Sequence, residues 1–110
     1  METKTAHGIV DALAISGEVL IPLVILKSNQ ENSQNFLGFI PGFTMKTIVE
    51  SSEDICKEKL KKYLVSKLKT MKELGEPFPF FPTRAEIMSE YDNVKCIEFV
   101  KVKSEQRKDQ

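Results

Sequence analysis

The sequence has 110 residues, of which 41% are hydrophobic, and its 16 basic and 16 acidic residues leave no net charge. This length fits one small domain with one sheet layer and one helix layer, and the composition excludes a disordered chain. Zero net charge argues against nucleic-acid binding through bulk electrostatics, because such affinity comes largely from neutralising phosphates. DNA is therefore not an expected partner.

Residues 1–18 show no clear pattern and are expected to form an N-terminal extension, either an amphipathic turn or an extended piece. No basic region precedes a long apolar stretch, and the apolar run Val19–Leu26 is too short to span a bilayer. The two isolated cysteines, Cys56 and Cys96, favour free thiols over a disulfide. We expect a cytoplasmic protein that does not enter a membrane.

Two paired strands are predicted next. Val19–Leu26 is rich in β-branched residues and fits a buried strand, although Pro22 implies an edge position, a bulge or a strand start. The polar residues 27–34 predict a hairpin loop. The strand Asn35–Ile40 should therefore pair antiparallel with the first.

A turn and a short third strand follow. Pro41 fixes φ and Gly42 accepts positive φ, so the pair should break one extended segment from the next. Residues 46–51 then alternate between wetter and drier positions, which predicts a short strand directly before a helix.

A long amphipathic helix is predicted over residues 52–74. Ser51 or Ser52 can cap it, and Ser51-x-x-Asp54 has the form of a capping box. Gly75 suits the left-handed position just past the helix end. Apolar residues recur at helical spacing on one face: Cys56, Leu60, Tyr63, Leu64, Leu68 and Met71. The opposite face is basic: Lys57, Lys61, Lys62, Lys69 and Lys72.

The segment Glu76–Pro82 contains three prolines and three phenylalanines. Proline keeps such a segment extended while the rings fill gaps, so we expect a connector that covers the core, with a partner-binding motif as the alternative. Thr83-x-x-Glu86 has the form of a capping box and predicts a short helix over residues 84–91. Alternation over residues 94–102 predicts the last strand.

No group of residues predicts catalysis or a cofactor. His7, the only histidine, has no expected partner, and neither metal-ligand spacing nor a glycine-rich phosphate loop is present. A two-metal site would need dispersed carboxylates such as Glu50, Asp54 and Glu98, and a helix cap or a solvated strand face explains each of these. We expect no enzymatic activity, no metal and no cofactor.

The lysine-rich helix face has two interpretations. It can be the solvated side of an amphipathic helix. It can also be a basic patch for RNA or an acidic protein, although no aromatic residues for base stacking are interleaved with the lysines. In the RNA interpretation the contacts come from Lys57, Lys61, Lys62 and Lys69.

The order of these parts resembles the HicB family of antitoxin-like domains. The resemblance covers residues 19–102 and rests on the Phe39-Ile40-Pro41-Gly42 turn with its short strand, the Ser-capped helix with an acidic first turn, and the Gly75-Glu76-Pro77-Phe78-Pro79 exit. It implies an α+β fold with a β-β-β-α-β core, described as partial RNase H-like, in which one long helix packs on an antiparallel sheet. A HicB-like domain over residues 19–103 would then precede a polar tail over residues 104–110.

The resemblance also implies a function. Family members mask a small partner toxin, HicA, which cleaves mRNA, and they form homodimers or higher oligomers. Many relatives have a Pro-Asp pair where this sequence has Gly38-Phe39, and many carry a C-terminal DNA-binding module, whereas this sequence ends soon after its last strand. We therefore expect a stand-alone, non-catalytic domain that does not bind an operator.

Aromatic side chains and the turn proline are the expected anchors for such a partner, with core packing as the alternative role for each: Phe39, Pro41, Phe43, Phe78, Phe80 and Phe81. Two other functions stay open. One is direct RNA binding through the lysine face, and the other is a metal-dependent nuclease that uses Glu50 or Asp54.

Overall fold

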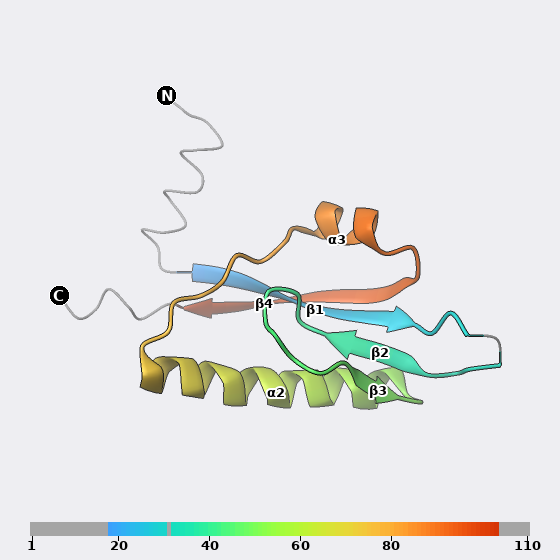
Figure 1. The fold of residues 1–110 in the computed structure, drawn as a ribbon, viewed down its shortest axis with the longest axis horizontal. Coiled ribbons are helices and arrows are strands. Elements are labelled where there is room, and N and C mark those ends of the chain that lie inside the picture. Colours follow the sequence, from blue (N-terminus) through green and yellow to red (C-terminus); the bar gives the residue numbers. More distant parts are fainter. Residues whose placement is uncertain (1–17, 31, 104–110) are drawn as a thin grey trace, which may run out of the picture.

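The computed structural model describes residues 18–30 and 32–103, and within them the fold is α+β: a four-stranded antiparallel sheet with a helix on each face (Figure 1). The expected polar tail, His7 and all but the last residue of the expected N-terminal extension lie outside the described residues. The strands are β1 (Glu18–Lys27), β2 (Phe36–Phe39), β3 (Ile48–Glu50) and β4 (Val94–Lys103). The helices are α2 (Glu53–Leu74) and α3 (Arg84–Glu90).

Strand β1 lies inside the sheet, whose strand order is β3-β2-β1-β4. It pairs antiparallel with β2 from Val24 to Lys27 and with β4 along nearly its whole length. Because helices pack on both faces, both sets of alternating side chains of β1 are covered. This explains the unbroken apolar run, in which every residue from 21 to 26 is buried.

Pro22 lies in the middle of this interior strand, opposite Phe99 of β4. It is neither at a bulge nor at the strand start, since the register shift falls between Ile25 and Leu26. β2 pairs with β1 only from Val24 onward, so at Pro22 the side of β1 away from β4 has no strand partner among the described residues. The missing N–H of Pro22 is therefore compatible with the hydrogen bonding between the strands. At this residue β1 is locally an edge of the sheet, as one of the expectations for Pro22 stated.

Helix α2 packs on one face of the sheet through the predicted apolar stripe. Cys56, Leu60 and Leu64 are buried there against Ile21, Leu23, Ile25 and Ile40. Ser52 caps the helix, because its hydroxyl oxygen accepts a hydrogen bond from the Ile55 N–H at 3.3 Å. The capping box expected from Ser51 and Asp54 is therefore wrong: the helix begins one residue later than that motif requires.

Helix α3 covers the other face. Its buried Ile87 packs against Val24, Leu26 and Ile97. The predicted capping box is confirmed, with the Thr83 hydroxyl accepting from the Glu86 N–H and the Glu86 carboxylate accepting from the Thr83 N–H. The described residues thus form two apolar clusters, one on each side of the sheet.

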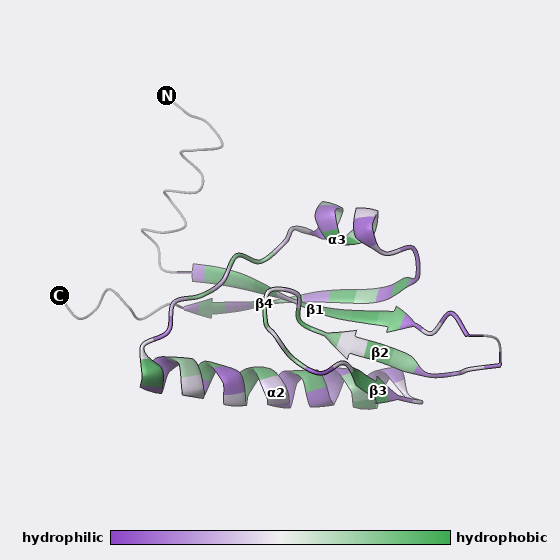
Figure 2. Ribbon diagram, in the orientation of Figure 1, coloured by the Kyte–Doolittle hydropathy of each residue, from purple (hydrophilic) through white to green (hydrophobic). Residues whose placement is uncertain are grey.

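The hydropathy of the chain follows this layering. Figure 2 shows hydrophobic residues concentrated on β1 and alternating with hydrophilic residues along α2. No helix within the described ranges is both long and apolar enough to cross a membrane.

Candidate partner-binding surface

The Pro41-Gly42 turn is a true β-turn. The Phe43 N–H donates to the Ile40 carbonyl at 3.1 Å, and Gly42 has a φ of +105°. A type II turn favours proline at its second position and requires a positive φ at its third position. Glycine adopts this positive φ at no steric cost. The turn reverses the chain at the end of β2 and brings Phe43 back over the α2 side of the sheet.

This turn contacts the proline-rich segment that follows α2. A Cβ atom on Gly42 would lie 2.9 Å from the Phe81 ring and 3.1 Å from the Phe80 carbonyl oxygen, so no side chain fits between them. The Phe43 and Phe81 ring centroids are 5.3 Å apart at an interplanar angle of 83°, an edge-to-face contact. Two segments that are distant in the sequence therefore form one surface.

Neighbouring rings fix both segments to the core. Phe43 also contacts Tyr63 of α2 at 6.5 Å, and Phe78 contacts Phe81 at the same centroid distance. The Lys67 ammonium lies 5.5 Å from the Phe43 ring centroid, within the range of a cation–π contact. The partly buried Phe43, Phe78 and Phe81 all pack against the α2-side cluster. The expected role of these three rings in core packing is therefore confirmed.

Phe80 differs from these neighbours because it is 80% exposed, more than any other large apolar side chain among the described residues. Its carbonyl oxygen lies close to Gly42, where an added Cβ atom would be 3.1 Å away, and the next ring in the chain is packed. We call the surface formed by these parts the turn–connector surface: Pro41, Gly42, Phe43, Phe78, Phe80 and Phe81.

Phe39 does not belong to this surface. Side chains alternate across a strand, and Gly38 faces α2, so Phe39 faces α3. Its ring packs edge-on against Tyr91, with centroids 5.4 Å apart. Of the six predicted partner residues, the structure therefore brings together five and places one on the opposite face.

Of the four lysines predicted to contact nucleic acid, two form ion pairs with Glu98 of β4. Its carboxylate lies 3.2 Å from the Lys61 ammonium and 4.0 Å from that of Lys57. Lys62 and Lys69 are exposed and have no ion pair among the described residues. The lysine face is thus partly neutralised at its end nearest β4.

The three carboxylates considered for metal binding, Glu50, Asp54 and Glu98, do not form a cluster that could hold a metal ion. Within the described ranges no three acidic, cysteine or histidine side chains are grouped so as to hold a metal ion. Glu50 pairs with Lys59, Glu98 pairs with the two lysines, and Asp54 lies in the first turn of α2.

Both cysteines are free thiols. Burial, and then the nearby Glu50 and Glu53 charges, raise the pKa of the Cys56 thiol above its usual value, while Lys59 partly opposes them. Its Sγ atom approaches the Ile48 carbonyl oxygen at 3.8 Å. A protonated, buried thiol is a packing group and a weak nucleophile.

Two features of the surface were missed by sequence reasoning. The sequence predicts a solvated strand face for Glu98, and no local pattern indicates that α2 places two lysines over it. The exposure of Val65, at 68%, is the second feature, and its signal in the sequence is a lone apolar residue among the lysines of the helix.

The chain was compared with protein-family models, with curated proteins and with solved structures, and no match was found in any of the three comparisons.

Proposed function

We propose that this chain is a non-catalytic binding module of the HicB type, which masks a HicA-type mRNA-cleaving toxin or a related small protein. The proposal is supported by the order of elements: an antiparallel hairpin, a Pro-Gly turn, a short strand, an immediately following Ser-capped helix and a Gly-Glu-Pro-Phe-Pro exit. It includes the partial RNase H-like assignment of the core.

The observation that carries the proposal is the exposure of Phe80 between two packed rings, Phe78 and Phe81. An exposed phenylalanine gains about 2 kcal/mol when a partner buries it, enough to make it an anchor. Its neighbours in the turn–connector surface, Phe43 and Phe81, are partly buried and packed against each other and against the core.

The segment that bears Phe80 is also restrained before any partner arrives. Gly75 ends α2 in the left-handed conformation, and the Glu76 N–H donates to the Met71 carbonyl at 2.9 Å. Pro77, Pro79 and Pro82 restrict the backbone that follows. Binding to a restrained segment loses little conformational entropy, which favours affinity.

The test is co-expression with the product of the neighbouring small reading frame, followed by size-exclusion chromatography with light scattering. We expect a stoichiometric complex that Phe80→Asp weakens by at least about thirtyfold, because an aspartate cannot be buried unpaired. Val49→Asp is the matched control, since Val49 is 51% exposed on β3 at the far edge of the sheet.

A complex that tolerates Phe80→Asp as well as Val49→Asp would contradict the assignment of the surface. A complete lack of association would contradict the antitoxin proposal itself. The same light-scattering data report whether the free chain forms the proposed homodimer or higher oligomer.

A further inference from the structure

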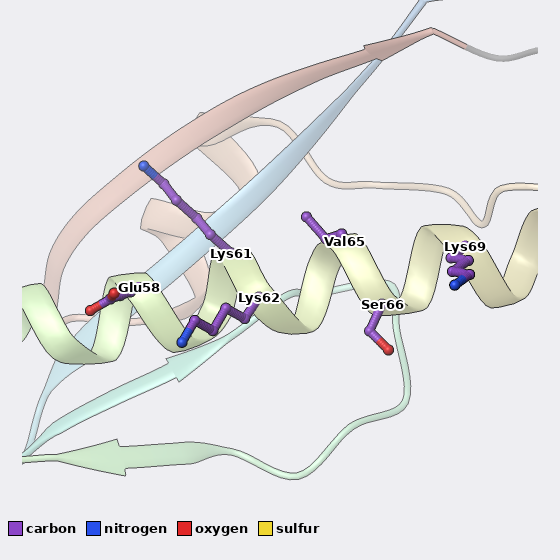
Figure 3. A pocket seen from close by; sticks show the side chains of 6 residues that line it. All are labelled: Glu58, Lys61, Lys62, Val65, Ser66 and Lys69. Atoms are coloured by element: carbon purple, nitrogen blue, oxygen red, sulfur yellow. The ribbon is translucent and has the colours of Figure 1, made fainter.

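The outward side of α2 carries a continuous surface that the proposed function does not use. It is an open depression on one helix, lined by residues at helical spacing, which we call the basic strip (Figure 3): Glu58, Lys61, Lys62, Val65, Ser66 and Lys69. From Glu58 to Lys69 it extends about 17 Å along the helix axis. One helix cannot enclose a small molecule, so the shape fits a macromolecular partner.

The strip has an apolar centre flanked by lysines, with Glu58 at its N-terminal end. Val65 is 68% exposed, Ser66 beside it is small, and Lys62 and Lys69 flank the pair one turn away on either side. In Figure 3 the sheet lies behind the helix and all six side chains belong to α2. Lys62 and Lys69 have no ion pair among the described residues, whereas Lys61 is paired with Glu98.

We propose that the basic strip binds an acidic amphipathic helix of a partner protein. An apolar side chain of that helix packs on Val65 and Ser66, and carboxylates one turn to either side pair with Lys62 and Lys69. These two lysines are seven residues apart, about 10 Å along the helix axis. In a partner helix, residues seven apart lie on the same face, so two of its carboxylates can match this spacing.

The geometry favours this partner over single-stranded RNA. An RNA groove needs several free cations and aromatic platforms for the bases, and the residues that line the strip include no aromatic ring. Val65 also lies at the centre of the strip and is 68% exposed, and its apolar surface offers no hydrogen-bond donor to a phosphate.

A second copy of the chain is a poorer fit. The strip has three lysines and one glutamate, so two copies would bring like charges together. Charge complementarity therefore selects an acidic partner.

The probe is a fluorescein-labelled synthetic peptide of about 20 residues that forms a Glu/Leu amphipathic helix, titrated by fluorescence anisotropy. A scrambled peptide of the same composition and a single-stranded RNA oligonucleotide are titrated in parallel. Lys62→Glu/Lys69→Glu should weaken peptide binding at least about tenfold. Val65→Ser should weaken it about fivefold through lost apolar contact.

The matched control is Lys95→Glu/Lys103→Glu, which changes the net charge by the same amount at exposed positions of β4. It should leave peptide binding within about twofold of the wild type. Circular dichroism checks that each variant keeps its helices. Phe80→Asp should also bind the peptide normally, so this test is independent of the turn–connector surface.

Four results would overturn the proposal. The first is equal binding of the scrambled peptide, and the second is equal loss in the β4 control; both would indicate charge alone. The third is tighter RNA binding that falls in the α2 lysine variant but not in Val65→Ser, which would make the strip an RNA site. The fourth is a dimer by light scattering that Val65→Ser abolishes, which would make it a self-interface.

Discussion

A Cβ atom placed on Gly38 of β2 would lie 2.6 Å from the Sγ atom of Cys56 on α2, closer than non-bonded atoms pack. The Cδ1 atom of Leu60 would lie 3.1 Å from the same Cβ atom. Because Gly38 has no side chain, β2 and α2 can pack closely against each other at this point. This contact sets how near α2 approaches the sheet.

Gly38→Ala should lower the free energy of unfolding by about 1–3 kcal/mol, because the added methyl group overpacks the interface. Urea denaturation measures the loss. The double variant Gly38→Ala/Cys56→Ala should lose less than the sum of the single variants, since removing Sγ relieves the closest contact. Additive losses, or a neutral Gly38→Ala, would show that the helix moves freely away from β2.

The raised pKa of Cys56 predicts a loss of stability at alkaline pH. The folded protein keeps this thiol protonated at a pH where the thiol of the unfolded chain has ionised. The unfolded state then binds fewer protons, so stability is intact below about pH 8.5 and falls as the pH rises further. In a Cys96→Ser background, the protein with Cys56 should lose stability relative to Cys56→Ala above that pH. Parallel curves for the two proteins would contradict the pKa shift.

Gly42 and Gly75 both have positive φ, but their substitutions should differ in cost. At Gly75 a Cβ meets nothing within 4 Å, so alanine should cost only the backbone strain, about 1 kcal/mol. At Gly42, with φ +105°, alanine adds the contact with Phe81 at 2.9 Å and should cost clearly more. Thermal denaturation of the two variants compares them directly. Equal costs would mean that the turn and the connector separate easily.

Glu98→Gln should change stability by less than about 1 kcal/mol, because its ion pairs with Lys57 and Lys61 are partly exposed and screened. The small difference should vanish in high salt. Glu90→Gln on α3 is the control, because Glu90 is exposed and forms no ion pair among the described residues. A large loss that persists in high salt would show that Glu98 positions α2 on the sheet.

The elements themselves were predictable because their signals are local. The α2 periodicity, its Gly75 stop and the Thr83 capping box are contained within a few turns of chain, and the structure confirms each. The apolar run of β1 and the alternation of β4 likewise predicted strands. The antiparallel pairing of β1 with β2 followed from the polar hairpin loop between them.

The surfaces were less predictable because they depend on contacts between distant segments. Which face Phe39 takes depends on Gly38 lying against α2, and the exposure of Phe80 depends on how the connector crosses the turn. The pairing of Glu98 with Lys61 requires β4 and α2 to be placed side by side. Even the cap is left open by the sequence between Ser51 and Ser52, a choice between adjacent serines that propensity cannot make, and the structure selects Ser52.

Burial of Phe80 by a partner protein, as proposed above, is tested most directly by a single fluorescence measurement. The sequence contains no tryptophan, so Phe80→Trp gives a protein with one indole reporter at this position. We expect emission typical of a solvent-exposed indole in the free protein and a blue shift on adding the product of the neighbouring small reading frame, since burial removes water from the ring. A complex that forms with no change in emission would show that the partner binds elsewhere and does not bury Phe80.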